Sequence, residues 1–186
     1  MKDLNKNNII QIDGMSFKKY ISSDRIDARI NGLAKELNSY YENKEPIIVG
    51  VLNGSIYFMI DLIKKINFKY QIDFIKASSY KGTKRMNLSS DILEKNKYED
   101  KDVLIVEDII DSGNTMNKIY NDLIDCNVKD FKVITLLNKQ IKSRNILFTI
   151  NWSGFNIIDK YVIGFGLDYN NLFRYLKDIY IENEKK

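Results

Sequence analysis

The residues best equipped for chemistry lie in one short stretch, VLIVEDIIDSGNTM, at positions 103–116. An apolar run leads directly into Glu107 and Asp108, and Asp111 then begins the sequence DSGNT. Carboxylates accept hydrogen bonds from hydroxyl groups and bind hard cations such as Mg²⁺. A turn that contains Ser, Gly and Thr can instead surround a phosphate. The stretch therefore places acids beside a phosphate-binding pattern, and its ligand must have use for both.

The neighbouring elements explain how this stretch could form a site. DVLIV at 102–106 is typical of a buried parallel strand, and TMNKIYNDLIDC at 115–126 has the apolar spacing of a helix. The acids then fall at the carboxyl end of a strand, where ligands bind in open α/β sheets. Gly113 permits a positive φ in the turn, and the start of the helix presents unpaired N–H groups to an anion. The P-loop pattern of ATP-binding proteins is absent from the sequence.

A ribose 5-phosphate would use every one of these groups. The turn, with hydroxyls from Ser112 and Thr115, would hold the phosphate, while Glu107 and Asp108 would accept hydrogen bonds from two ribose hydroxyls, directly or through Mg²⁺. The alternative is an ordinary strand-turn-helix with its acids in solvent. Two adjacent acids, a third acid and D-S-G-x-T in one strand-to-helix context favour the ligand.

Strand and helix patterns alternate through the middle of the chain. The segment 78–97 is polar and aperiodic, so we expect a long loop there, and the tail holds short apolar runs at 146–150 and 161–165. The alternation predicts an α/β fold with a parallel-sheet core flanked by helices. The predicted helices span 22–41, 55–66 and 115–126, and the predicted strands span 46–52, 70–77, 102–106 and 131–137.

The composition excludes several kinds of site. The 186 residues include no histidine and a single cysteine, Cys126. This sequence therefore cannot form a Ser-His-Asp triad, a Cys-His pair, a His-ligated metal site or a structural zinc site. Any metal must be a hard ion bound by oxygen atoms, and any general base must be Asp, Glu, Lys or Tyr.

Charge and hydropathy point to a cytoplasmic protein without a nucleic-acid or membrane partner. The net charge of +4 is small and the lysines are scattered, which is typical of a solvated surface. One cysteine suits a reducing compartment. The first residues lack the apolar core of a signal peptide, and no apolar stretch approaches membrane-spanning length.

Five segments in order resemble the hypoxanthine-guanine phosphoribosyltransferases, which are type I phosphoribosyltransferases. These segments are VLNGS, SSYKGT, VEDIIDSGNTM, LLNK and DKYVIGFGLDYNNLFR, and they cover roughly 47–177. The resemblance implies the type I phosphoribosyltransferase fold over a single domain, 1–186. It implies a core at about 22–138. The terminal segments, which are the N-terminal segment and about 139–186, would form a small hood.

The resemblance also implies an activity. The family uses Mg²⁺ and transfers the phosphoribosyl group of 5-phosphoribosyl-1-pyrophosphate (PRPP) to N9 of a 6-oxopurine, releasing pyrophosphate. Hypoxanthine or guanine would then give IMP or GMP, in purine salvage. Relatives form dimers or tetramers, so a homodimer or homotetramer is expected.

Several residues match the PRPP side of the family's site. Glu107 and Asp108 match the pair that binds the ribose hydroxyls and the metal. Asp111 matches the acid/base near purine N7, and Ser79 and Tyr80 match the mobile loop that closes over the reaction. The cradle of the 5′-phosphate matches Ser112, Gly113, Asn114 and Thr115.

The pyrophosphate loop matches with one departure. Asn53 and Gly54 occupy it, and Arg174 matches an arginine that reaches pyrophosphate. The family often has lysine where Asn53 stands. One positive charge is therefore missing, and we expect the backbone to do more of the holding.

The purine side rests on four further residues. Lys139 matches the lysine that contacts O6, Tyr161 matches an aromatic residue that stacks on the base, and Val162 follows it. Asp168 matches a second acid on the metal and purine side. Taken singly, Lys139 would be a surface lysine and Tyr161 a core aromatic; their common order in the chain favours the site.

Two other functions remain open. Some proteins with the PRPP motif are regulators that bind nucleotides and nucleic acid, and such a regulator need not retain Lys139, Tyr161 and Asp168. The second alternative is a transferase for another base, such as xanthine or a pyrimidine. The segments LLNK and DKYVIGFGLDYN disfavour it. The preference among hypoxanthine, guanine and xanthine cannot be read from the sequence.

Overall fold

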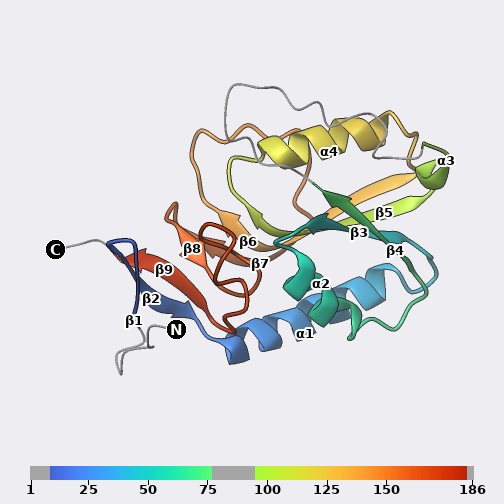
Figure 1. Ribbon diagram of the computed structural model, residues 1–186. Coiled ribbons are helices and arrows are strands. Elements are labelled where there is room, and N and C mark those ends of the chain that lie inside the picture. Colours follow the sequence, from blue (N-terminus) through green and yellow to red (C-terminus); the bar gives the residue numbers. More distant parts are fainter. Residues whose placement is uncertain (1–8, 77–94, 184–186) are drawn as a thin grey trace.

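The computed structural model describes residues 9–76 and 95–183. Two sheets make up the framework, one of five strands and one of four (Figure 1). Every neighbouring pair in the five-stranded sheet is parallel. Its strands, in spatial order, are β4 (Gln71–Lys76), β3 (Ile47–Leu52), β5 (Asp102–Ile110), β6 (Asp130–Lys139) and β7 (Trp152–Ile157).

Helices cover both faces of this sheet. In Figure 1, α1 (Ser23–Tyr40) and α2 (Ile56–Ile63) lie below it and α4 (Asn114–Ile124) lies above it, with the short α3 (Lys95–Tyr98) near one end. Alternate strand residues enter two separate cores. Ile48 and Leu104 pack in the cluster with α1 and α2, whereas Ile47 and Val103 pack in the cluster with α4. Burial on both faces is why the sequence shows continuous apolar runs.

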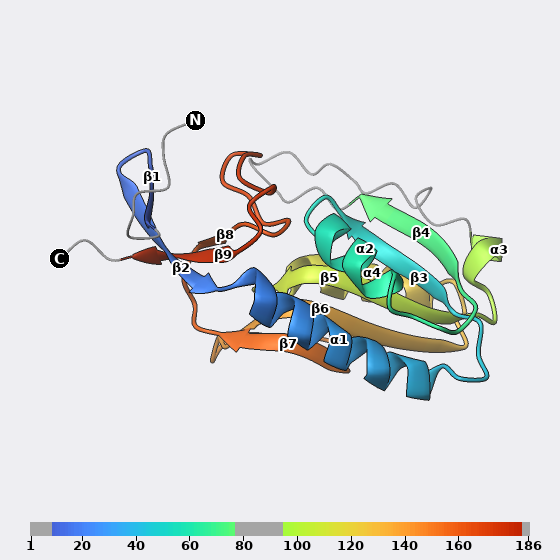
Figure 2. The ribbon, with the colours of Figure 1, turned by 90° about the horizontal axis from the view of Figure 1, so that it is seen from below.

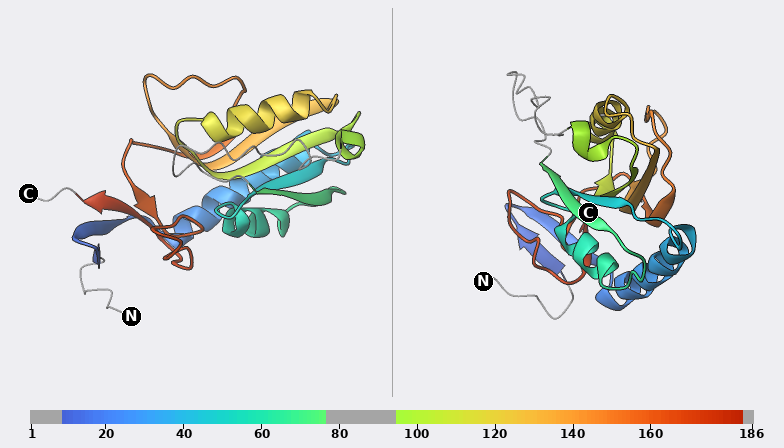
Figure 3. Two further views of the ribbon diagram at one scale, coloured as in Figure 1. Left: turned by 45° about the horizontal axis from the view of Figure 1, so that its top comes forward. Right: turned by 90° about the vertical axis from the view of Figure 1, so that its right-hand side faces the viewer.

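The second sheet joins segments from the two ends of the described chain. It is antiparallel, and β2 pairs with β9, so residues near 20 lie beside residues near 180 (Figure 2). This sheet extends beyond one end of the larger one, as the left view of Figure 3 shows. Its strands are β1 (Ile9–Ile12), β2 (Met15–Ile21), β9 (Ile179–Asn183) and β8 (Val162–Ile163), in that spatial order.

The α/β prediction with a parallel core, flanking helices and a small terminal hood is confirmed. The differences concern element ends and strands that the sequence patterns did not predict, among them β1, β2 and β7. Strand β5 runs to Ile110 rather than 106, so Glu107 and Asp108 lie within the strand. The five-stranded sheet continues past residue 138, because β7 pairs in parallel with β6. Within the predicted loop at 78–97, α3 begins at Lys95, and the remainder lies outside the described residues.

Candidate functional site

A cavity of about 450 Å³ opens at the carboxyl ends of the central strands. It gathers most of the residues that the sequence singled out, from three separate parts of the chain. Ser79 and Tyr80 lie outside the described residues. The predicted site residues that line the cavity are Asn53, Gly54, Glu107, Asp108, Asp111, Ser112, Gly113, Asn114, Thr115, Asp168 and Arg174.

The turn into α4 has the geometry of an anion cradle. Gly113 adopts φ +84°, the left-handed region, and precedes the first helical residue, Asn114. A Cβ at Gly113 would lie 2.4 Å from Cγ2 of Ile146, so a side chain has neither the conformation nor the room. The Asn114 N–H donates to Oγ of Ser112 at 3.4 Å. In an α-helix the next N–H groups have no partner within the helix, and the helix dipole favours negative charge at this end.

Two buried carboxyl groups stand beside this cradle. Glu107 is 6% exposed and Asp108 is 9% exposed, and Oε1 of Glu107 accepts a hydrogen bond from the Asp108 N–H at 2.9 Å. Burial, together with the charge of Asp108, raises the pKa of Glu107 well above its ordinary value of 4.5. Hydroxyl donors or a cation would relieve this concentration of negative charge. The pair is therefore suited to a diol or a hard metal ion.

The loop after β3 lies directly against these acids. A Cβ on Gly54 would be 1.8 Å from Oδ2 of Asp108, so only glycine allows this approach. On its other side, a Cβ on Gly166 would be 2.2 Å from the Gly54 carbonyl oxygen. Gly54 is thus held between the Asp108 carboxylate and the backbone of the 164–166 segment.

An ion pair closes the hood side of the cavity. Nη2 of Arg174 lies 2.7 Å from Oδ1 of Asp168, and Nη1 of Arg174 donates to the Gly166 carbonyl. Oδ2 of Asp168 accepts the Asn171 N–H at 2.7 Å. These bonds hold the Arg174 guanidinium against the 164–166 segment, which also packs against Gly54. Asp168 and Arg174 therefore meet the loop at Gly54 within one cavity.

Lys139 lies beside the cavity and reaches into it through an ion pair. Its Nζ lies 2.8 Å from Oδ2 of Asp111 and 3.2 Å from Oδ1 of Asp159, and its side chain is 9% exposed. Burial lowers the pKa of Lys139, but the hydrogen bonds to Asp111 and Asp159 raise it by more, so the pKa lies above 10.5. Lys139 is accordingly a charged donor held between two acids.

The two remaining purine-side residues behave differently from each other. Tyr161 is 44% exposed, and its hydroxyl donates to the Asp168 carbonyl at 3.0 Å. Its ring forms T-shaped contacts with the rings of Phe17 and Tyr169. The Val162 side chain instead packs in the core cluster with 6% exposure. Val162 is not among the residues that line the cavity, so the structure places this predicted purine contact in the core instead.

Three residues near the site were missed by the sequence analysis. Asp159 is the second partner of Lys139, and it begins the segment DKYVIGFGLDYNNLFR, which had been singled out. Nη1 of Arg144 donates to the Lys139 carbonyl at 3.0 Å and the Ile110 carbonyl at 3.3 Å, and no local pattern marks it. Lys76 lines the cavity from the end of β4. Its parallel pairing with Leu52, the residue before Asn53, is the signal that could have placed it there.

The donor set suits a metal ion that arrives with a ligand. Among the described residues, no group of three or more acidic, cysteine or histidine side chains is placed to hold a metal by itself. Glu107, Asp108 and Asp168 nevertheless line one cavity. Mg²⁺ is typically bound by one or two carboxylates together with substrate phosphates. These residues fit that arrangement.

None of the helices in the described ranges has the length and apolar character needed to cross a membrane.

Comparison with known proteins identifies the family of this chain. The family model described as a phosphoribosyl transferase domain matches residues 21–170. The hypoxanthine-guanine-xanthine phosphoribosyltransferase of Tritrichomonas foetus is 39% identical over 88% of this chain and 90% of its own length. The hypoxanthine phosphoribosyltransferase of Escherichia coli (strain K12) is 38% identical over 84% of this chain and 89% of its own.

A solved structure gives the same result. The hypoxanthine-guanine phosphoribosyltransferase of Bacillus anthracis superposes with a TM-score of 0.79 at 33% identity, over 90% of this chain and 97% of that one. Sequence and fold thus agree over most of the molecule, and the chain belongs to the phosphoribosyltransferase family, in the group of the hypoxanthine-guanine phosphoribosyltransferases.

Proposed function

We propose that this chain transfers the 5-phosphoribosyl group of PRPP to N9 of hypoxanthine or guanine, releasing pyrophosphate and forming IMP or GMP. The observation that carries the proposal is the Lys139–Asp111 ion pair at the edge of a cavity that also holds the turn at 112–115. A phosphate-binding turn alone would suit many ligands. A lysine donor beside an acid at its open side suits a 6-oxopurine, which presents O6 and N7 on one edge.

The ribose phosphate would be held by the two ends of one strand-turn-helix unit. The N–H groups at the start of α4, with Ser112 and Thr115, would bind the 5′-phosphate. Glu107 and Asp108 would accept hydrogen bonds from the ribose hydroxyls. Fixing the sugar at both ends orients C1′ for attack, which is a proximity contribution.

The purine would lie between Tyr161 and the Lys139–Asp111 pair. Lys139 would donate to O6, and Tyr161 would stack on the ring. The new bond forms from N9 to C1′ as the bond from C1′ to the pyrophosphate oxygen breaks. Asp111 is the group near N7 that can exchange the purine's proton, since the sequence contains no histidine.

Glu107, Asp108 and Asp168 would hold Mg²⁺, and the ion would supply positive charge that neutralises the departing pyrophosphate. The residues themselves would fix the sugar and the leaving group relative to each other. Arg174 would exchange part of its ion pair with Asp168 for a contact to pyrophosphate.

The purine-side residues favour catalysis over a regulator that only binds nucleotides. Lys139, Tyr161 and Asp168 all surround one cavity or contact its lining. Binding of a ribose phosphate alone would require none of them.

A cytoplasmic location and a homodimer or homotetramer stay predictions, and sedimentation of the purified protein would measure the oligomeric state.

A panel of bases tests the proposal. The protein would be mixed with PRPP, Mg²⁺ and, separately, hypoxanthine, guanine, xanthine, adenine and uracil, and nucleotide products separated by chromatography. We expect IMP from hypoxanthine or GMP from guanine, with one pyrophosphate released per nucleotide. If neither 6-oxopurine gives a nucleotide while PRPP still binds, the regulator is the better description.

A further inference from the structure

The pyrophosphate end of the cavity has an unusual balance of charge. Asn53 stands in the loop after β3, and its amide can donate hydrogen bonds but carries no charge. Four carboxyl groups line the same cavity. Asp111 is paired with Lys139 and Asp168 with Arg174, whereas the other two face no cation in the described ranges and oppose the approach of an anion such as pyrophosphate. The four acids are Glu107, Asp108, Asp111 and Asp168.

Only two cationic side chains line this cavity among the described residues, Lys76 and Arg174. Arg174 is already paired with Asp168, at 2.7 Å. Lys76 is exposed and forms no ion pair with any residue in the described ranges. Among the described residues, an incoming anion would therefore displace no ion-pair partner of Lys76, whereas it must compete with a carboxylate for Arg174.

Strand register explains how Lys76 reaches this end of the cavity. β3 and β4 are parallel, and Lys76 pairs with Leu52, the residue that precedes Asn53. Neighbouring strands lie about 4.8 Å apart, so the backbone of Lys76 is a direct neighbour of the loop that carries Asn53. The flexible four-carbon stem of lysine then carries the ammonium towards the loop.

We propose that Lys76 binds the pyrophosphate group of PRPP and supplies, from strand β4, the positive charge that Asn53 does not supply from the loop. The inference rests on the proposed phosphoribosyl transfer and assigns a new substrate-binding residue to it. Lysine is a compact charge with three donors, which suits phosphate oxygens that have no fixed planar orientation. The charge would act on bound PRPP and on the departing pyrophosphate alike.

The simpler interpretation is that Lys76 protects a sheet edge. β4 is an edge strand of the five-stranded sheet, and lysine on an edge strand discourages pairing with another molecule. That role predicts no effect on substrate affinity. The two interpretations therefore differ in their kinetic consequences.

Substitution with and without the charge separates them. We expect Lys76→Gln to raise the KM for PRPP and the Kd for Mg²⁺-pyrophosphate by about 10- to 100-fold, the usual effect of losing a charged hydrogen bond. The KM for hypoxanthine should change less than about threefold. Lys76→Arg, which keeps the charge, should recover most of the affinity.

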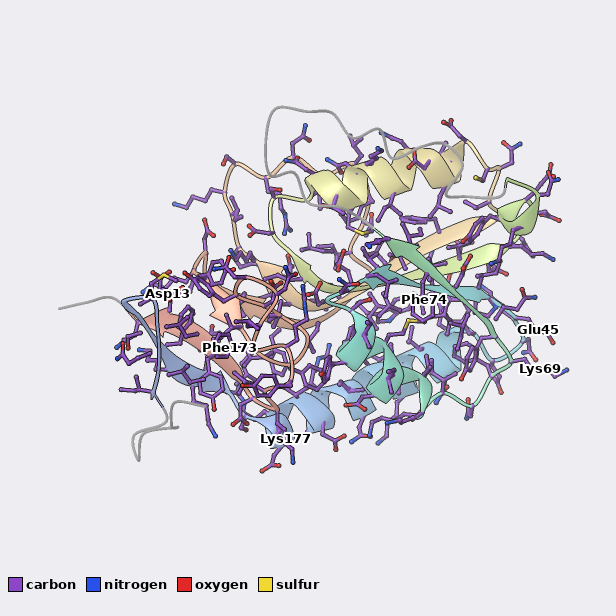
Figure 4. The ribbon with its side chains drawn as sticks, in the orientation of Figure 1. Asp13, Glu45, Lys69, Phe74, Phe173 and Lys177 are labelled. Atoms are coloured by element: carbon purple, nitrogen blue, oxygen red, sulfur yellow. The ribbon has the colours of Figure 1, made fainter. Side chains whose placement is uncertain are left out.

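Lys69→Gln is the matched control. Lys69 lies just before β4 in the chain. Its Nζ is 3.4 Å from Oε1 of Glu45, and Figure 4 shows it far from Phe173 of the hood. It does not line the cavity. We expect its KM for PRPP to equal that of the unmodified protein.

Moving the charge gives a second test that a folding defect cannot imitate. Asn53→Lys introduced into the Lys76→Gln protein should lower the KM for PRPP again, because a lysine then stands in the loop on the neighbouring strand. An active unmodified enzyme whose PRPP KM and pyrophosphate Kd are unchanged by Lys76→Gln would overturn the inference. So would equal losses in Lys76→Gln and Lys69→Gln. Absence of any nucleotide product from the unmodified protein would refute the proposed function instead.

Discussion

Nζ of Lys139 lies 2.8 Å from Oδ2 of Asp111. The two residues come from the carboxyl ends of neighbouring parallel strands, β6 and β5, so the sheet itself sets their separation. Arg144 adds a further constraint, since its guanidinium bonds the carbonyls of Lys139 and Ile110, the latter next to Asp111. A donor and an acceptor are thus arranged before a base arrives, which reduces the ordering cost of recognition.

Asp111→Asn tests the chemical role of this pair. The amide keeps the shape of the side chain but loses the charge and the ability to exchange a proton. Loss of an acid/base group typically lowers the rate by about 10²- to 10⁴-fold, so we expect kcat to fall by that amount. PRPP affinity, measured by calorimetry, should change far less. A kcat within a few-fold of the unmodified enzyme would show that Asp111 does not act on the purine.

Lys139→Gln tests base selection. A protonated lysine can only donate, so it matches the O6 acceptor of hypoxanthine and opposes the amino group of adenine. Sites that leave a polar group unpaired discriminate by about 10⁴- to 10⁵-fold, and we expect that ratio of kcat/KM for hypoxanthine over adenine. Glutamine can donate or accept, so the ratio should shrink, mainly through loss of hypoxanthine use. Comparable kcat/KM values for both bases in the unmodified enzyme would mean that Lys139 is not the selector.

Gly54→Ala tests the contact between the loop and the acid pair. The new Cβ would lie 1.8 Å from Oδ2 of Asp108, so the carboxylate must move away from its position beside Glu107. We expect a raised KM for PRPP and a loss of about 1–3 kcal/mol in the free energy of unfolding.

Gly32→Ala is the control for this substitution. Its Cβ would meet only Nη1 of Arg29, at 3.4 Å, and alanine within a helix is favoured by about 0.5–1 kcal/mol. The control should have unchanged kinetics and equal or greater stability. If Gly54→Ala also keeps its PRPP KM, the close approach to Asp108 has no functional consequence.

Asp178→Asn tests, through pH, the contact of the small sheet with the start of α1. Asp178 lies 2.6 Å from Nζ of Lys19 and accepts the Ser23 N–H at 2.8 Å. Burial raises the pKa of Asp178, but the bonds from Lys19 and Ser23 lower it by more, so the pKa lies below 3.8. A lowered pKa means that the carboxylate stabilises the fold above pH 3.8, and that this contribution is lost as the pH falls through the lowered pKa.

We therefore expect Asp178→Asn to lose about 1–2 kcal/mol of unfolding free energy at pH 7. The difference from the unmodified protein should shrink as the pH falls below 3.8, in urea denaturation followed by circular dichroism. Asp61→Asn, in an exposed pair with Lys64, serves as the control and should change stability little. A difference that stays constant down to the acid range would contradict the assignment.

The central strands could be predicted from the sequence because burial on both faces leaves unbroken apolar runs. The end of β5 could not, since Glu107 pairs with Thr135 inside the sheet although acidic residues are disfavoured in strands. The acidic residues Glu107 and Asp108 thus made the strand pattern end too early in the sequence. The hairpin at β1 and β2 was also missed, although Asp13-Gly14, both with positive φ, is a strong turn signal.

Pairings across the chain were the least accessible to sequence reasoning. Nothing near Lys139 indicates that it pairs with Asp159, because that contact depends on where the chain returns after β7. The same holds for Lys76, which meets the cavity only through its register with Leu52. Family motifs pointed to the residues at 107–115, since they are contiguous, whereas compensation for Asn53 required the three-dimensional arrangement.

The position of β9 has a consequence for how the enzyme matures during synthesis. β9 pairs with β2 on one side and β8 on the other. The strands β2 and β8 therefore cannot join into one sheet until Ile179–Asn183 has left the ribosome. The five strands of the larger sheet are all made before that, and domains fold as they are synthesised. The turn at 112–115, the proposed phosphate site, therefore belongs to strands that are made before β9, while the small sheet is completed only when β9 is available. A premature stop within those few codons would remove the strand that joins β2 to β8 and leave the larger sheet complete.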